Sequence, residues 1–317
     1  MANKRTKKKT GKKKKRTKRT LKIITSPLNN AIAKGDITKV KELLTKGADS
    51  NEFTNVWCTS KVQPFIRDAE LFICKVNSSY NDIGTPIQVA LTLRKRAISN
   101  VLLDHGVDVT KQYRKTYKST LQMAIPCGLD LVKKVYEKGC TDVNHVDFNG
   151  NTALGAAVWF KHAPQKDSRV EVVQFLLDKG ANVNHINKYN GASPLEIACR
   201  VGHIDVITLL IRKGANVNNR NKRLRTPLHE AILSTKNTNC NKEKIVRLLV
   251  KHGANVNTHS KDTHSTPLSS ATAYGLVNVV ATLLKLGAKK KTMDTDKMTP
   301  LANATWYGYD SIIKLLQ

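Results

Sequence analysis

A three-residue motif recurs along this chain of 317 residues, and its spacing constrains the fold more than any other feature. The motif is Ser or Thr, usually followed by Pro and then by Leu or Ile. It begins at positions 85, 119, 152, 193, 226, 266 and 299, with an earlier copy at 26. The gaps from 85 onward are 34, 33, 41, 33, 40 and 33 residues, so the two long gaps look like one period plus an insertion. A period this constant rules out a single globular core and predicts stacked units, which usually form binding surfaces rather than catalytic sites.

Residues 224–258 show what one unit should form. Thr226 fits the N-cap of a helix, and Pro227 fits its first position, where a missing N–H costs nothing. Apolar residues then recur at helical spacing, a polar stretch interrupts them, and a second apolar run follows from residue 245. Gly253 stands where a left-handed residue ends a helix. The unit is therefore predicted to be two helices and an extended loop, and it needs its neighbours to bury its apolar faces.

Several strings share these offsets, among them T-P-L-H-E-A at 226–231, G-A-S-P-L-E-I-A-C-R-V-G-H at 191–203 and L-L-D-K-G-A-N-V-N at 176–184. They resemble ankyrin repeats. The resemblance covers about residues 24–317 in eight units, of which the first two are less typical. It implies an all-α solenoid of stacked helix-turn-helix units with protruding hairpin loops, and it does not identify the partner.

The expected organisation is a basic tail over residues 1–22 and a repeat domain over 23–317. The units lie near 24–52, 85–110, 119–144, 152–184, 193–218, 226–257, 266–291 and 299–317. Residues 53–84 do not follow the period, and they fit either an enlarged loop packed on the stack or a partner-specific insertion. Two shorter insertions, 161–168 and 236–241, fall between the helices of their units. The apolar residues near Gln317 predict a weak C-terminal end that frays or self-associates in a mostly monomeric protein.

The charge is strongly positive, with a formal net charge of +30 at pH 7. Residues 1–22 hold 13 of the 54 lysines and arginines and no acidic residue, so this tail is expected to be disordered. It fits a nuclear import signal or a non-specific nucleic-acid arm, and a membrane anchor is less favoured. The targeting residues would be Lys12, Lys13, Lys14, Lys15, Arg16, Lys18 and Arg19.

Partner contacts are predicted from the resemblance, because proteins of this kind bind through hairpin tips and the exposed ends of the first helices. Carried onto this sequence, those positions are rich in aromatic and basic residues: Trp159, Phe160, Tyr189, Arg200, Arg223, Arg225, Tyr274, Trp306 and Tyr307. Aromatic side chains are frequent interface anchors. The alternatives are that these aromatics pack on neighbouring units and that the basic residues simply aid solubility.

The favoured function is a non-enzymatic scaffold that binds an acidic or mixed protein partner on its concave face. The alternative is a nucleic-acid-associated protein that uses the tail and the basic tips. No phosphate-binding, nucleophile or zinc motif occurs, so no enzyme activity, cofactor or metal is expected. His203 and His229 are expected to make structural hydrogen bonds.

The expected compartment is the cytoplasm or nucleus. Six scattered cysteines without a C-x-x-C pair indicate reduced thiols, and no apolar run reaches the roughly 20 residues of a membrane span. The family that the chain resembles includes host-cell factors, effectors of intracellular bacteria and products of large DNA viruses, and the frequent lysine and asparagine favour the latter two. For such an origin the compartment would be that of the host cell.

Overall fold

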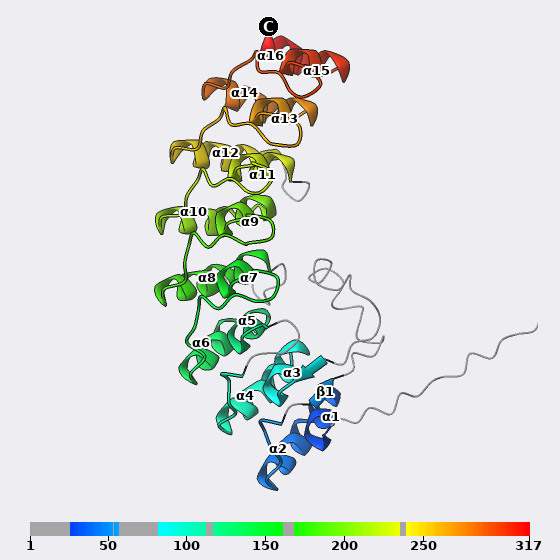
Figure 1. Ribbon diagram of the computed structural model, residues 1–317, viewed down its shortest axis with the longest axis vertical. Coiled ribbons are helices and arrows are strands. Elements are labelled where there is room, and N and C mark those ends of the chain that lie inside the picture. The colour runs from blue at the N-terminus through cyan, green and yellow to red at the C-terminus, as the bar shows by residue number, and fades with distance from the viewer. Residues whose placement is uncertain (1–25, 53, 57–81, 112–116, 161–167, 235–238) are drawn as a thin grey trace, which may run out of the picture.

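Paired helices stack in a single column in the computed structural model, which describes residues 26–52, 54–56, 82–111, 117–160, 168–234 and 239–317 (Figure 1). The first helices of the units are α1 (Pro27–Lys34), α3 (Pro86–Thr92), α5 (Thr120–Ala124), α7 (Ala153–Trp159), α9 (Pro194–Val201), α11 (Pro227–Leu233), α13 (Pro267–Ala273) and α15 (Pro300–Trp306). The second helices are α2 (Ile37–Thr45), α4 (Arg96–Asp104), α6 (Leu129–Glu137), α8 (Ser168–Asp178), α10 (Ile204–Arg212), α12 (Asn239–Lys251), α14 (Val277–Lys285) and α16 (Asp310–Leu316). The column bows, with the second helices on its convex side and the first helices on its inner side.

The repeated motif starts the first helices as the sequence predicts. In the fifth unit, Ser193 Oγ accepts a hydrogen bond of 3.2 Å from the Glu196 amide, and Pro194 occupies the first helical position. The helix ends at Gly202, whose φ of 86° is left-handed. Pro126 shortens the first helix of the third unit, where α5 gives way to the 3-10 turn η2 (Ile125–Cys127). These local rules explain why the units share one shape.

The core runs the length of the column because the third residue of each motif points into it. This residue is buried in seven of the units: Leu28, Ile87, Leu121, Leu154, Leu195, Leu228 and Leu268. Its counterpart in the eighth unit, Leu301, is 36% exposed. The all-α repeat solenoid predicted from the sequence is therefore confirmed.

An asparagine ladder ties successive units together beyond the second helices. Asn184 Nδ2 donates to the Gly214 carbonyl at 3.0 Å, and its Oδ1 accepts from the Asn216 amide at 2.8 Å. Asn144, Asn218 and Asn257 make the same pair of bonds to the next unit. Each of these asparagines thus satisfies a helix-end carbonyl and a loop amide of its neighbour.

A short β-ribbon marks the ends of the segment that departs from the period. Strand β1 (Thr54–Val56) pairs antiparallel with β2 (Asp82–Gly84), with Thr54 opposite Gly84. The ribbon brings the two ends of this segment together beside α3. The remainder of the predicted 53–84 insertion, like residues 161–167 and 235–238, lies outside the described residues, so its role stays a prediction.

Candidate functional site

The predicted contact residues fall on two parts of the molecule, the C-terminal ends of the first helices and the hairpin tips. Trp159 is the last residue of α7 and Phe160 its C-cap, while Trp306 and Tyr307 hold the same places at α15. Tyr274 is the C-cap of α13. The period thus carries these aromatics to equivalent positions on the inner side of the column.

Two aromatic side chains at the end of α7 are each paired with an arginine from another unit. The Arg200 guanidinium carbon lies 5.7 Å from the centre of the Trp159 ring. That of Arg94, which follows α3, lies 5.1 Å from the centre of the Phe160 ring. These distances are those of cation–π contacts, in which the electron-rich face of the ring attracts the guanidinium charge. We call Arg94, Trp159, Phe160 and Arg200 the arginine–aromatic cluster.

A buried acidic pair adjoins this cluster. Glu230 Oε2 lies 3.7 Å from Arg200 Nε, and Asn221 Nδ2 donates to Glu196 Oε1 at 2.6 Å and to Glu230 Oε1 at 3.4 Å. Glu196 is 1% exposed. Burial raises its pKa to about 7, and the Glu230 charge adds to that rise, while the Asn221 bond opposes it. Glu196 therefore titrates near neutral pH, and the Asn221 bonds to both carboxylates couple α9 to α11.

The aromatic residues of the last two units form a second group. Trp306 is 79% exposed, and Tyr274 and Tyr307 are 55% and 53% exposed. Tyr307 stacks on Tyr309, with ring centres 5.8 Å apart and planes 24° apart. Side chains of this size bury a large area for few rotatable bonds when a partner covers them. In the described part of the chain, their outer faces are open to solvent.

The hairpin tips differ from one another in how exposed their side chains are and in whether their charges are paired. Tyr189 is 52% exposed, with Lys188 Nζ 5.0 Å from its ring centre, and Arg223 is exposed. Arg225 instead bonds Asp262 of the next tip at 2.6 Å and has a side chain 19% exposed. Arg225 joins two tips, so its charge is already paired with that of Asp262.

Two histidines serve the structure, as the sequence suggests. His229 Nδ1 accepts from the Thr226 amide at 3.2 Å, and Nε2 bonds the Ser265 carbonyl at 3.3 Å, which confirms its predicted hydrogen-bonding role. His203 contacts the Arg169 guanidinium. Burial lowers the pKa of each histidine to about 4, so both are neutral at pH 7. Within the described ranges, no three potential metal-ligating side chains come together.

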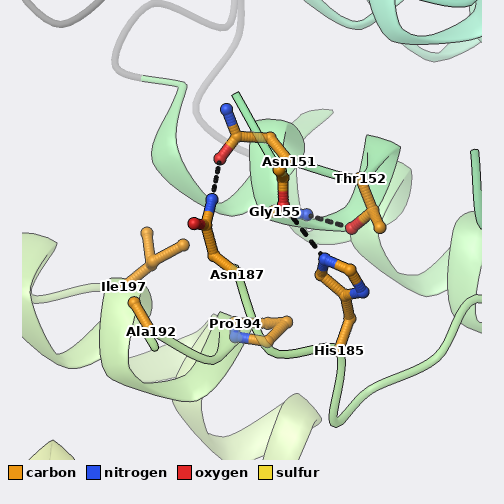
Figure 2. Close-up of a pocket in the computed structure, with 9 residues that line it drawn as sticks. Asn151, Thr152, Gly155, His185, Asn187, Ala192, Pro194 and Ile197 are labelled. Atoms are coloured by element: carbon orange, nitrogen blue, oxygen red, sulfur yellow. Dashed lines mark hydrogen bonds between the residues drawn. The ribbon is translucent and has the colours of Figure 1, made fainter. Parts of the chain in front are cut away.

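A small hollow lies between the fourth and fifth units, with polar groups at its rim (Figure 2). Asn187 Nδ2 donates to Asn151 Oδ1 at 3.0 Å, and His185 Nε2 bonds the Gly150 carbonyl at 3.0 Å. The space is sufficient for about one water molecule. These contacts hold neighbouring hairpins in register, so we assign the hollow to the scaffold rather than to a ligand.

Sequence reasoning missed Arg94 and the acidic pair. Arg94 stands where several other units have a turn glycine, and nothing in the sequence indicates that its side chain reaches Phe160. Glu196 and Glu230 sit inside motifs that read as helix starts. The sequence signal for this acidic pair was that Glu196 and Glu230 are charged, whereas the equivalent positions of most other units hold uncharged side chains.

The comparisons with known proteins agree with this architecture. The family model described as "Ankyrin repeats (3 copies)" matches residues 160–260 and 238–317. No curated protein shows significant similarity to the chain. Among the described residues, no helix has the length and apolar character needed to cross a membrane.

Proposed function

Because the chain is an ankyrin-repeat protein, we propose that it is a non-enzymatic scaffold that binds a protein partner along the inner side of its column. Ankyrin repeats are generally protein–protein interaction modules and are typically non-enzymatic. The partner would lie across the ends of the first helices and against the hairpin tips. The contact residues would be Trp159, Phe160, Tyr189, Arg200, Arg223, Tyr274, Trp306 and Tyr307, while Arg225 would support the tips from within.

The exposure of Trp306 carries this proposal. A tryptophan that is 79% exposed at the end of α15, beside Tyr307, offers a large apolar surface that water solvates poorly. Aromatic residues in such positions are frequent hot spots, because a partner that covers them excludes water from both surfaces. The preferred partner surface would be acidic, since the chain carries a net charge of +30.

Affinity capture followed by mass spectrometry tests the scaffold. Proteins retained by the full chain are compared with those retained by Trp306→Ala and Trp159→Ala. The matched control is Val277→Ala, which trims an exposed apolar residue on the convex side, at the start of α14. The proposal expects both tryptophan variants to lose a protein that the control retains. Equal retention by all three variants would remove the inner side as the binding surface.

We further propose that the basic residues 1–22 direct the protein to the nucleus. This segment lies outside the described residues, and the proposal rests on its 13 lysines and arginines. A fluorescent fusion without residues 2–20 should redistribute to the cytoplasm, and an unchanged distribution would refute nuclear import. The alternative, a nucleic-acid arm, predicts that duplex binding weakens between low and physiological salt and disappears with the deletion.

A further inference from the structure

We infer that the arginine–aromatic cluster is a recognition site for an acidic peptide segment, with Arg94 as a specificity-determining residue. This inference rests on the proposed scaffold function and narrows it to a place and a chemistry. Four residues from three units contribute: Arg94 from the second, Trp159 and Phe160 from the fourth, and Arg200 from the fifth. The site therefore exists in the assembled column and not in any single unit.

The backbone at Arg94 has an unusual conformation. Its φ is 53°, in the left-handed region, and the residues that follow the first helices of other units there include Gly35, Gly202, Gly275 and Gly308. A residue with a Cβ is disfavoured in this region by about 1 kcal/mol. Glycine would relieve that strain but would remove the guanidinium from the Phe160 ring. Strained backbone positions of this kind concentrate at functional sites.

The charge balance of the cluster is positive. Among the described residues, no carboxylate lies within ion-pair distance of Arg94, which is exposed. Arg169 adds a further cation that contacts the Phe160 carbonyl and His203, which burial keeps neutral at pH 7. Glu230 offsets part of the Arg200 charge. Three guanidiniums thus meet two buried carboxylates, Glu196 and Glu230, so the cluster keeps a net positive charge.

The chemistry of guanidinium indicates the ligand. A guanidinium over an aromatic ring still carries N–H groups at its edge, and such groups pair bidentately with carboxylates. One edge of the Arg200 guanidinium already faces a carboxylate, because its Nε lies 3.7 Å from Glu230 Oε2. The two arginines contact different rings, those of the adjacent residues Trp159 and Phe160. This arrangement favours carboxylates spaced along a peptide over the continuous charge of a phosphate backbone.

Binding of a defined peptide to the full chain tests this inference. The probe is a fluorescein-labelled peptide of twelve residues that alternates glutamate and alanine, and its reference contains glutamine in place of glutamate. Fluorescence anisotropy at fixed ionic strength compares the parent with Arg94→Gln, Arg94→Lys and the control Arg212→Gln. Arg212 is exposed at the end of α10 on the convex side, so its variant removes the same charge elsewhere. Circular dichroism confirms that each variant is folded.

The expected result is that Arg94→Gln weakens binding of the glutamate peptide about fivefold, while Arg212→Gln changes it less than about twofold. Arg94→Lys should lose most of the same affinity, because lysine keeps the charge without the stacked fork. Equal effects of Arg94→Gln and Arg212→Gln would overturn the site. A twelve-nucleotide single strand that depends on Arg94 while the peptide does not would overturn its assignment to carboxylates.

The outcome separates this inference from the scaffold proposal. If Arg94→Gln binds the peptide as the parent does, while Trp306→Ala loses its captured protein, the scaffold stands and the acidic-peptide site is wrong. If Arg94→Gln loses the peptide while both tryptophan variants retain every captured protein, the anion site stands and the scaffold surface is wrong.

Discussion

One backbone position in each hairpin, two residues before the N-cap, has left-handed geometry in most units. Glycine fills it at Gly150 and Gly191, but the sixth unit has Leu224 there, with a φ of 55°. Leu224 is also 40% exposed, so burial of its side chain offsets little of the strain in its backbone. Residues with a Cβ are disfavoured in this geometry, whereas glycine adopts it readily.

Leu224→Gly should therefore raise the free energy of unfolding by about 1 kcal/mol, measured by urea denaturation. Gly191→Ala is the opposing control, because its new Cβ would lie 2.8 Å from the Lys222 amide nitrogen while φ stays at 73°. That variant should be less stable than the parent. Loss of stability in Leu224→Gly would show that the exposed leucine packs more strongly than the strain costs.

At the scale of the helix, His229 and Gln88 make equivalent hydrogen bonds, one through an imidazole ring and the other through an amide. Gln88 Oε1 accepts from the Thr85 amide at 3.0 Å, and its Nε2 donates to the Lys111 carbonyl at 2.6 Å. His229 makes the equivalent pair of bonds to Thr226 and Ser265. Both side chains tie the start of a first helix to the following hairpin.

His229→Gln should keep these bonds and remove an acid sensitivity. Burial lowers the pKa of His229 to about 4, below its ordinary 6.5, so between these values the unfolded chain binds a proton that the folded chain does not. Stability from this residue is present above pH 6.5 and is lost as the pH falls toward 4. Between pH 7 and pH 5, the free energy of unfolding measured by urea denaturation should fall by about 1–2 kcal/mol more in the parent than in His229→Gln. Equal losses would contradict a neutral buried imidazole.

Glu196 should give the opposite dependence on pH. Burial raises its pKa to about 7, above its ordinary 4.5, so between these values the folded chain holds a proton that the unfolded chain releases. Stability therefore falls as the pH rises through this window. Glu196→Gln should be more stable than the parent by about 2 kcal/mol at pH 8 and by little at pH 5, in the same denaturation assay. A destabilised variant at pH 8 would mean that the ionised carboxylate is needed.

The helices were predictable because their signals are local. Thr226, Pro227 and Gly253 act on neighbours within a few residues, so the sequence predicts where helices start and stop. The arginine–aromatic cluster depends instead on Arg94 and Phe160, which are 66 positions apart in the sequence and meet only when the units stack. Glu196, Asn221 and Glu230 likewise come together through stacking. Side-chain reach across a stack has no one-dimensional pattern, so these contacts could not be predicted.

For the whole molecule, the asparagine ladder should govern how strongly the units unfold together. Asn218 Nδ2 donates to the Gly253 carbonyl at 2.8 Å, and its Oδ1 accepts from the Asn255 amide at 2.9 Å. Asn218→Ala removes both bonds between the fifth and sixth units, which should cost about 1–2 kcal/mol. The slope of the urea transition should also decrease, because weaker coupling lets the two sides unfold separately.

Asn278→Ala is the control for that measurement, since Asn278 is exposed on α14 and outside the ladder. Its midpoint and slope should match those of the parent. If Asn218→Ala behaves as this control does, cohesion between these units comes from their apolar core alone.

The ladder also makes the number of units independent of the geometry of any one of them. Each ladder asparagine bonds the glycine carbonyl of the next unit, so its geometry does not depend on units further along the chain. Excision of residues 193–225 would leave Asn184 facing the Gly253 carbonyl as it now faces that of Gly214. Recombination between such equivalent points could shorten or lengthen the column by whole steps while every remaining junction stays intact. Each ladder junction thus depends on two neighbouring units, and the number of units can vary without changing the other junctions.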